Sequence, residues 1–321
     1  MKNRQFILRL SLSIILLGYI VSRLDFGETL GVLKNFNPLF YAAGFACLLI
    51  SQLSHAYLLR TLMGIHEKPP AVASAFKALA VGTFFGMFLP GSGGPDIMLA
   101  YNFSRNAKKK ENPLSAIIFA RVMILFAAIF ISLILSFTLE DHLAGIRNIF
   151  IAAAAFIAIF GFLTLNRRCA DISAGLFAFL KRNRWTHLLY RTYFVISGYR
   201  EQKQLLLKIL PLALLTSAFR ITIDYFVARS LGLSIPAQYF FIFVPLISIA
   251  AVIPVSISGI GVREGTYVGL FSTVGVKTAE AFSISILAFS TGILFALIGA
   301  VIYITGGAAL KPPEENADAA A

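Results

Sequence analysis

The chain has 321 residues, of which 58% are hydrophobic and only 13% are charged. Soluble domains carry about 25% charged residues, so this composition excludes a soluble enzyme, a secreted disulfide scaffold and a disordered protein. The net charge of +13 is typical of basic cytoplasmic loops beside anionic lipids, and we expect no nucleic acid partner. Long apolar runs exclude a porin-type barrel. The expected fold class is an all-α polytopic membrane protein.

Apolar runs follow one another from residue 6 to residue 305, and about six are long enough to span a membrane. We expect full spans at about 6–22, 39–59, 114–139, 146–165, 209–228 and 281–305. The first follows a basic flank without a clear cleavage site, which favours a retained span over a removed signal peptide. We therefore expect one integral membrane domain over 1–310 and a disordered acidic tail over 311–321.

The segment 71–103 is expected to enter the membrane and return to the side from which it came. Basic residues flank it in 60–68 and in 105–110, and basic loops stay in the cytoplasm. Two full spans would need about 40 residues and a turn, so a re-entrant hairpin is favoured over a fully crossing one. Its turn is expected at the Gly/Pro cluster 91–95. Irregular backbone at that depth is tolerated only inside protein or beside a wet cavity.

The second half of the chain repeats this pattern from the opposite side of the membrane. A second hairpin is expected over 239–276, with its turn at 254–261. The chain then divides into inverted halves, about 1–139 and 140–310, which each contain two spans, a hairpin and a further span. Inverted repeats with broken helices are a transporter architecture, in which substrate binds at the repeat interface.

The segment 166–208 joins the two halves and carries the strongest cytoplasmic signal. It holds nine Lys and Arg residues against Asp171 and Glu201. Because apolar residues and Trp185 are mixed among the basic ones, we expect one or two amphipathic helices on the membrane surface. A solvated basic loop is the alternative. The charge distribution along the whole chain predicts that both termini lie in the cytoplasm.

The second predicted hairpin contains Pro254-Val-Ser-Ile-Ser-Gly-Ile-Gly-Val-Arg-Glu-Gly265. Glycines expose backbone N–H groups there, and the start of the following helix favours an anion. Arg263 adds a planar fork that suits phosphate. We expect Arg263 to hold a lipid phosphate, and an Arg263–Glu264 pair that only closes the hairpin is the alternative. The other substrate-binding residues expected in this hairpin are Ser256, Ser258, Gly259, Gly261 and Glu264.

Further ionisable residues lie in the first hairpin and in the neighbouring spans, where charge is costly. Asp96 could cap the returning helix, bind an amine or pair with an arginine. For Arg121 an inward-facing role is favoured over snorkelling to the interface. Arg220 and Asp224 share one helix face and are expected to form an ion pair. The substrate-binding residues expected in this region are Ser92, Gly93, Gly94, Asp96 and Arg121.

Motifs of catalysis and metal binding are missing from the sequence. The four histidines are scattered, without the spacing that a metal site requires. Neither a Gly-x-Ser-x-Gly elbow nor a Walker loop occurs. We therefore expect no metal, no cofactor and no enzymatic activity.

The glycine-rich motif at 254–265 resembles the signature of the lysylphosphatidylglycerol synthase transmembrane-region family, a flippase-like group also called uncharacterised protein family 0104. The segment Phe88-Leu-Pro-Gly-Ser-Gly-Gly-Pro-Asp-Ile-Met-Leu-Ala-Tyr101 is similar to the first conserved segment of that family. Pro95 stands where the family usually has glycine, and Leu99 stands where an arginine is common. Arg121 matches an arginine near the start of the family's following span.

The resemblance implies a membrane protein that handles lipids. In fused relatives this domain moves aminoacylated phosphatidylglycerol between leaflets and a separate domain makes it; we expect this chain to lack that synthase domain. The expected function is a translocase in a bacterial or archaeal inner membrane. Its partners would be anionic, aminoacylated or polyprenyl-linked lipids, together with a separate synthase. The alternative is a membrane enzyme, or an accessory or scaffold subunit, in the synthesis of lipids or lipid-linked glycans.

Overall fold

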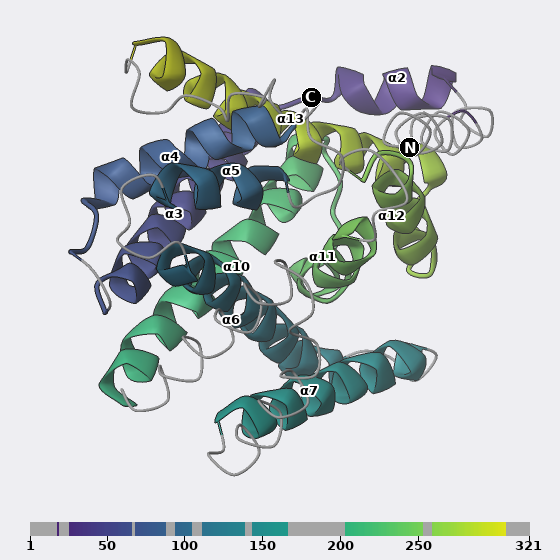
Figure 1. The fold of residues 1–321 in the computed structure, drawn as a ribbon. Helices are drawn as coiled ribbons and strands as arrows, with labels where there is room; N and C mark the ends of the chain where they lie inside the picture. The colour runs from purple at the N-terminus through teal and green to yellow at the C-terminus, as the bar shows by residue number, and fades with distance from the viewer. Residues whose placement is uncertain are drawn as a thin grey trace, which may run out of the picture.

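The structure, a computed structural model, describes residue 18 and residues 26–65, 68–87, 94–104, 111–138, 143–165, 203–252 and 259–305. These residues form α-helices joined by short turns and contain no strand. The helices are α2 (Phe26–Lys34), α3 (Pro38–Met63), α4 (Val72–Gly86), α5 (Gly94–Ser104), α6 (Glu111–Ser136), α7 (Ala144–Leu165), α10 (Lys203–Ser230), α11 (Ala237–Val252), α12 (Val262–Ser272) and α13 (Thr278–Thr305) (Figure 1). The predicted all-α polytopic class is confirmed, because α3, α6, α10 and α13 are long and apolar enough to cross a membrane.

The helix boundaries differ from the predicted apolar runs at several points. The first run, 6–22, lies outside the described residues apart from Gly18, as do 166–202 and the tail. α10 begins at Lys203, six residues before the apolar run at 209, and these six residues, KQLLLK, mix polar and apolar side chains. The last six residues of the amphipathic segment predicted over 166–208 therefore belong to α10.

The predicted loop between the first two spans contains a helix, α2, which the apolar pattern did not indicate. Asn37 ends this connection and caps α3, because its side-chain oxygen accepts a hydrogen bond of 2.9 Å from the Leu39 N–H. Lys277, in the turn before α13, donates a hydrogen bond of 2.7 Å to Glu28 of α2. This bond and the Glu28 charge raise the pKa of Lys277 above its ordinary value. This ion pair joins α2 to the turn that precedes α13.

The pair α3 and α10 forms the centre of the bundle, and the two helices run antiparallel. Near the start of α3, Gly44 faces the Ile223 carbonyl, where an added Cβ would lie 3.3 Å away. Farther along α3, the Ser54 hydroxyl donates a hydrogen bond of 3.1 Å to the carbonyl of Leu212, which is earlier in α10. Each helix is the second predicted span of its half. Their opposed directions are those expected of inverted halves.

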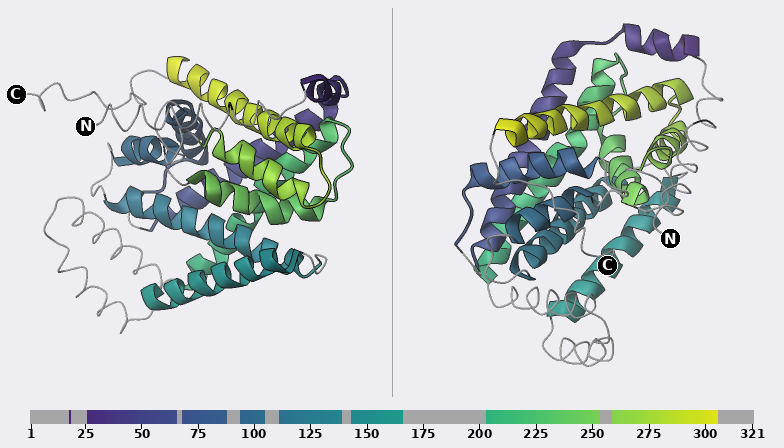
Figure 2. Two further views of the ribbon diagram at one scale, coloured as in Figure 1. Left: turned by 90° about the vertical axis from the view of Figure 1, so that its right-hand side faces the viewer. Right: turned by 45° about the horizontal axis from the view of Figure 1, so that its top comes forward.

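The remaining helix contacts recur in matching pairs between the two halves. Within the halves, α3–α4 matches α10–α11, α4–α5 matches α11–α12, and α5–α6 matches α12–α13. Across the halves, α4 packs on α13 and α11 packs on α6. Figure 2 shows α13 over α4, and α7 beside α6 at the opposite edge. The helix that ends each half therefore covers the hairpin of the other half.

Both predicted hairpins have helical arms that are shorter than a membrane is thick. α4 and α11 have 15 and 16 residues, which corresponds to about 22–24 Å. The returning arms α5 and α12 have 11 residues each, or about 16 Å. The hydrocarbon core of a bilayer is about 30 Å thick. The arm lengths agree with hairpins that turn inside the membrane, and the re-entrant path itself stays a prediction.

Candidate functional site: a polar cluster between the hairpins

The apolar core of the described chain falls into two clusters, one around each hairpin. The first includes Leu79 and Leu99, and the second includes Phe240, Phe243 and Phe271. α3, α6 and α10 contribute to both clusters. On α3 and α10 the two clusters are separated by polar residues, and the ionisable side chains lie in this region.

Five buried polar side chains of α3 and α10, called the polar layer here, separate the two apolar clusters. The Ser51 hydroxyl donates a hydrogen bond of 2.9 Å to the Thr216 carbonyl, and the Ser217 hydroxyl donates one of 2.7 Å to the Ile124 carbonyl of α6. The polar layer consists of Ser51, Ser54, His55, Thr216 and Ser217. Such hydroxyl bonds join helices within a membrane.

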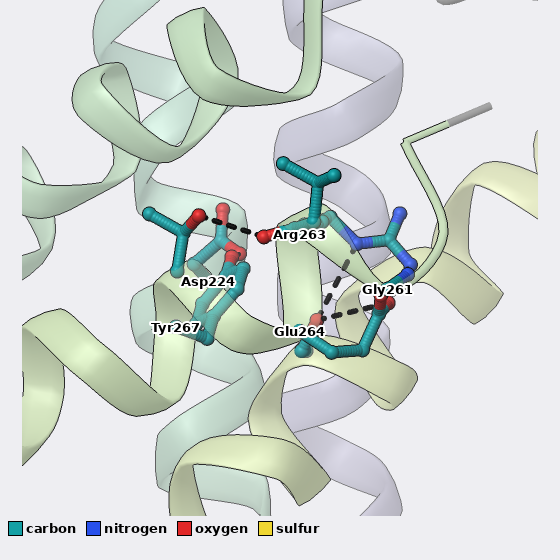
Figure 3. A network of polar contacts seen from close by, with 8 residues as sticks. Asp224, Gly261, Arg263, Glu264 and Tyr267 are labelled. Atoms are coloured by element: carbon teal, nitrogen blue, oxygen red, sulfur yellow. Dashed lines mark hydrogen bonds and ion pairs between the residues drawn. The ribbon is translucent and has the colours of Figure 1, made fainter. Parts of the chain in front are cut away.

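The second hairpin contributes a buried ion pair to this region (Figure 3). The Arg263 guanidinium lies 2.6 Å from a carboxylate oxygen of Glu264, whose side chain is 1% exposed. The other Glu264 oxygen accepts a hydrogen bond of 2.6 Å from the Gly261 N–H. Arg263 also donates to the Ser285 hydroxyl of α13 at 3.3 Å and lies 4.3 Å from the centre of the Phe289 ring. Arg263 therefore has three side-chain partners, namely Glu264, Ser285 and the Phe289 ring.

The backbone before α12 explains this arrangement. Gly259 and Gly261 have φ of +77° and +87°, values that favour glycine, and they turn the chain into the helix. Glu264 is then the third residue of α12, where a carboxylate accepts from a free backbone N–H and opposes the helix dipole. The alternative reading of the motif, an Arg–Glu pair that closes the hairpin, describes the observed contacts of Arg263.

Tyr267 joins the second hairpin to α10, a contact that the sequence did not predict. Its hydroxyl donates a hydrogen bond to Asp224, and both side chains are buried. Glu264, Tyr267 and Phe271 form the buried face of α12. Their spacing of three and four residues is the signal by which the sequence could have indicated Tyr267.

A second ion pair joins the first hairpin to the following span, between Asp96 of α5 and Arg121 of α6. Arg121 donates through Nε and Nη2 to one Asp96 oxygen, at 3.0 and 2.8 Å. Asp96 is the third residue of an 11-residue returning helix, as Glu264 is in α12. Of the three roles left open for Asp96, pairing with an arginine is the one the structure contains. The Arg121 side chain remains 40% exposed, more than twice the 17% of Arg263.

Arg220 and Asp224 lie one turn apart on α10. Asp224 accepts a hydrogen bond from the Tyr267 hydroxyl of α12. Within the ranges that the structure describes, no carboxylate lies within ion-pairing distance of Arg220. The two residues share a helix face, as predicted, but the predicted ion pair does not form, and the Asp224 carboxylate is bound by Tyr267 instead.

The other predicted site residues lie in or near the two turns. Gly94 is the first residue of α5, and Gly259 and Gly261 form the turn before α12. The remaining predicted residues, Ser92, Gly93, Ser256 and Ser258, lie outside the described residues. In the described part of the chain, no group of three or more His, Cys, Asp or Glu residues could hold a metal ion.

The first hairpin is closely packed at its two departures from the motif, Pro95 and Leu99. A Cβ added to Gly86 would lie 2.3 Å from the Pro95 nitrogen, and one added to Gly82 would lie 3.7 Å from the Leu99 nitrogen. Pro95 therefore fits against a glycine of α4. Leu99 is 1% exposed and belongs to the apolar cluster of this hairpin. An arginine at position 99 would have to be buried there.

A protein-family model described as the lysylphosphatidylglycerol synthase TM region matches residues 6–300. The chain belongs to this family. The match spans both hairpins and the polar cluster, and it confirms the resemblance indicated by the two motifs. No curated protein and no solved structure matched the chain. Family membership supports a membrane protein related to lipid modification or translocation.

The hydrogen bond between Tyr267 and Asp224 can be tested by removing one atom. Tyr267→Phe keeps the ring stacked on Phe271 but leaves a buried carboxylate without its donor. We expect the free energy of unfolding in mixed detergent micelles to fall by about 2 kcal/mol. Tyr303→Phe, which keeps its edge contact with Phe85, is the matched control and is expected to change little. Equal stability of the two variants would contradict the role given to this bond.

Proposed function

We propose that this family member is a lipid translocase, which moves a phospholipid or a lipid-linked head group between the leaflets of a bacterial or archaeal cytoplasmic membrane. One observation carries the proposal: an apolar helical bundle contains two arginine–carboxylate pairs, one between α5 and α6 and one on α12, and α10 adds a buried Asp224 that is bound by Tyr267 of α12. Ionisable residues are costly in a bilayer and mark substrate pathways. Family membership supports a lipid as the substrate.

The first hairpin and α6 together supply the groups that suit an aminoacylated phospholipid. The phosphate of such a lipid carries a negative charge. The half-exposed Arg121 suits it, because the planar guanidinium can donate two parallel hydrogen bonds. The amine of the lipid carries a positive charge, for which Asp96, 27% exposed, is a partner. In this proposal the head group passes between the hairpins while the acyl chains stay in the bilayer, and the Asp96–Arg121 pair opens as the head group replaces it.

The two arginine–carboxylate pairs therefore have different roles in the proposal. Arg263 is 17% exposed and has partners in Glu264, Ser285 and Phe289, so it holds the second hairpin in place. Arg121 has one partner and more exposure, so it is the residue that contacts the head group. A substitution of Arg121 should reduce transport without unfolding the protein.

Leaflet exchange in proteoliposomes tests the proposal. Fluorescent phosphatidylglycerol and its aminoacylated form are reconstituted with the full chain, and an impermeant quencher reports the fraction in the outer leaflet. We expect exchange well above that of empty liposomes, and a loss of about tenfold for Arg121→Ala, which removes charge-assisted hydrogen bonds. Arg229→Ala is the control, because Arg229 lies at the end of α10 over the Phe40 ring.

Two results would count against a translocase. Exchange equal to that of empty liposomes, across these lipids and a polyprenyl phosphate, would remove the basis of the proposal. A rate unchanged in Arg121→Ala would show that Arg121 does not contact the head group. The unfolding temperature of each reconstituted variant is measured in parallel, so that a misfolded protein is not counted as an inactive one.

A further inference from the structure

Asp224 differs from the other carboxylates of the polar cluster, because it has no positively charged partner. Asp96 and Glu264 each have a carboxylate oxygen within 3 Å of an arginine nitrogen. Asp224 is 7% exposed and accepts its hydrogen bond from the neutral hydroxyl of Tyr267, which is also buried. Within the described ranges, no basic side chain lies within ion-pairing distance of Asp224. A negative charge on Asp224 is therefore stabilised by a hydrogen bond without an ion pair.

The surroundings of Asp224 and Tyr267, which lie beside each other in Figure 3, are apolar. Ile221 and Ala228 lie about one turn before and after Asp224 on α10, and both belong to the second apolar cluster. The Tyr267 ring is stacked on Phe271, with 5.8 Å between the ring centres, and Phe271 contacts two aromatic rings of α11. A carboxylate that is removed from water without a cation beside it is far less costly once it binds a proton.

The charged groups whose fields act on Asp224 come from two helices. Arg220 precedes it by one turn on α10, and Arg263 lies on α12, where it already has a carboxylate partner. The other helices that pack on α10 are α3, α6, α11 and α13. In the part of the chain that the structure describes, none of their ionisable side chains forms an ion pair or a hydrogen bond with Asp224. These side chains include Tyr41, His55, Arg121, Tyr239 and Glu280. Asp224 can therefore be neutralised by a proton without displacing any basic side chain.

We propose that Asp224 and Tyr267 form a proton-binding site that couples lipid exchange to pH. An O–H bond forms on the Asp224 carboxylate, and the hydronium ion that supplies the proton becomes water. The hydrogen bond from Tyr267 then ends on a neutral group, and such bonds are about half as strong as those to a charged group. Tyr267 lies on α12 and Asp224 on α10, so the proton loosens the second hairpin from the centre of the bundle. This inference rests on the proposed function, because it names the ion that regulates lipid exchange.

Infrared difference spectroscopy of the purified full chain in a neutral detergent detects the bound proton directly. The pH is lowered from about 9 to about 5, a range in which exposed carboxylates with pKa values near 4 stay ionised. We expect a protonated-carboxyl band in wild type and its loss in Asp224→Asn. Tyr267→Phe removes a donor to the charged form, so its band is expected about one pH unit higher. Glu28→Gln, which lacks an exposed carboxylate, is the matched control and should retain the band.

Leaflet exchange of phosphatidylglycerol, whose phosphodiester keeps its charge over this range, tests the coupling. We expect wild type to exchange at least about threefold faster at about pH 5 than at about pH 9, because protonation loosens the second hairpin. Asp224→Asn resembles the protonated state in charge and size, so it is expected to exchange at the acid rate at both pH values. The four histidines of the chain also titrate in this range. A pH dependence that persists in Asp224→Asn would therefore overturn the proposal.

The remaining outcomes also decide the proposal. A wild type without the band, or a band that persists in Asp224→Asn, would overturn the proton-binding site. A band in wild type together with equal exchange at both pH values would overturn the coupling to lipid exchange. If Asp224→Asn fails to fold, the titration of Tyr267→Phe takes its place, and a band at the same pH as in wild type would overturn the proposal.

The proton-binding site and the translocase proposal can fail separately. If wild type shows the Asp224 band but no leaflet exchange at either pH, the proton-binding site stands and the translocase proposal falls. If the band is absent while exchange is fast and equal in wild type and Asp224→Asn, the translocase stands and the proton-binding site falls. The two assays use the same protein preparations, which makes the comparison direct.

Discussion

Glu264→Gln is expected to lower the free energy of unfolding by about 3–5 kcal/mol, the largest effect of any substitution considered for this protein. Glu264 is 1% exposed and binds both the Arg263 guanidinium and the Gly261 N–H. Glutamine keeps the size of the side chain but removes the charge that neutralises Arg263. The arginine is left with a neutral Ser285 and the Phe289 ring. Denaturation in mixed detergent micelles provides the measurement.

Two further variants show whether the loss comes from the buried charge. Removing both charges, in the double variant Arg263→Gln/Glu264→Gln, should restore part of the stability, because no charge is then left without its partner. Glu28→Gln breaks the exposed pair with Lys277 and should change stability little, because exposed pairs contribute little. A double variant no more stable than Glu264→Gln would show that Arg263 is not the cause of the loss.

Gly299→Ala is expected to lower the free energy of unfolding by about 3 kcal/mol, since it forces α13 away from α4. A Cβ at position 299 would lie 2.1 Å from the carbonyl oxygen of Ala80 and 2.9 Å from the Val81 nitrogen. These are backbone atoms, so no side chain can rotate to make room. Small residues allow such close helix contacts within membranes. Separation of the two helices would also weaken the ring contacts of Phe76 with Phe295 and of Phe85 with Tyr303.

Gly292 provides the matched control for this prediction. It lies two turns earlier in the same helix, and a Cβ added there would meet nothing within 4 Å. Gly292→Ala should leave stability unchanged or raise it by up to about 1 kcal/mol, because alanine favours a helix more than glycine does. Thermal unfolding of both variants in one detergent distinguishes the contact from the change in helix propensity. Equal shifts of the two unfolding temperatures would contradict the close contact between α4 and α13.

The sequence by itself determined the class of protein, the approximate place of each described long helix and the family. Runs of about 20 apolar residues permit little except membrane-spanning helices, and the motif at 254–265 identified the family that the comparison confirmed. The positions of both hairpin arms also followed from the sequence, because glycine and proline interrupt the apolar runs. The helix α2 was missed, since its nine residues carry charges at both ends and its contact with Lys277 is distant in the chain.

Only the tertiary structure decided which of the ionisable residues meet. Asp96 and Arg121 are 25 residues apart, and Asp224 and Tyr267 are 43 apart. Contacts at such separations depend on how whole helices pack, which no local pattern of residues specifies. The sequence indicated that Arg220 and Asp224 share a face of one helix, which they do. The Asp224 carboxylate, however, accepts its hydrogen bond from Tyr267 of α12, a different helix. The spacing of residues along the sequence predicted which helices carry the ionisable side chains, and the packing of those helices determines which side chains contact each other.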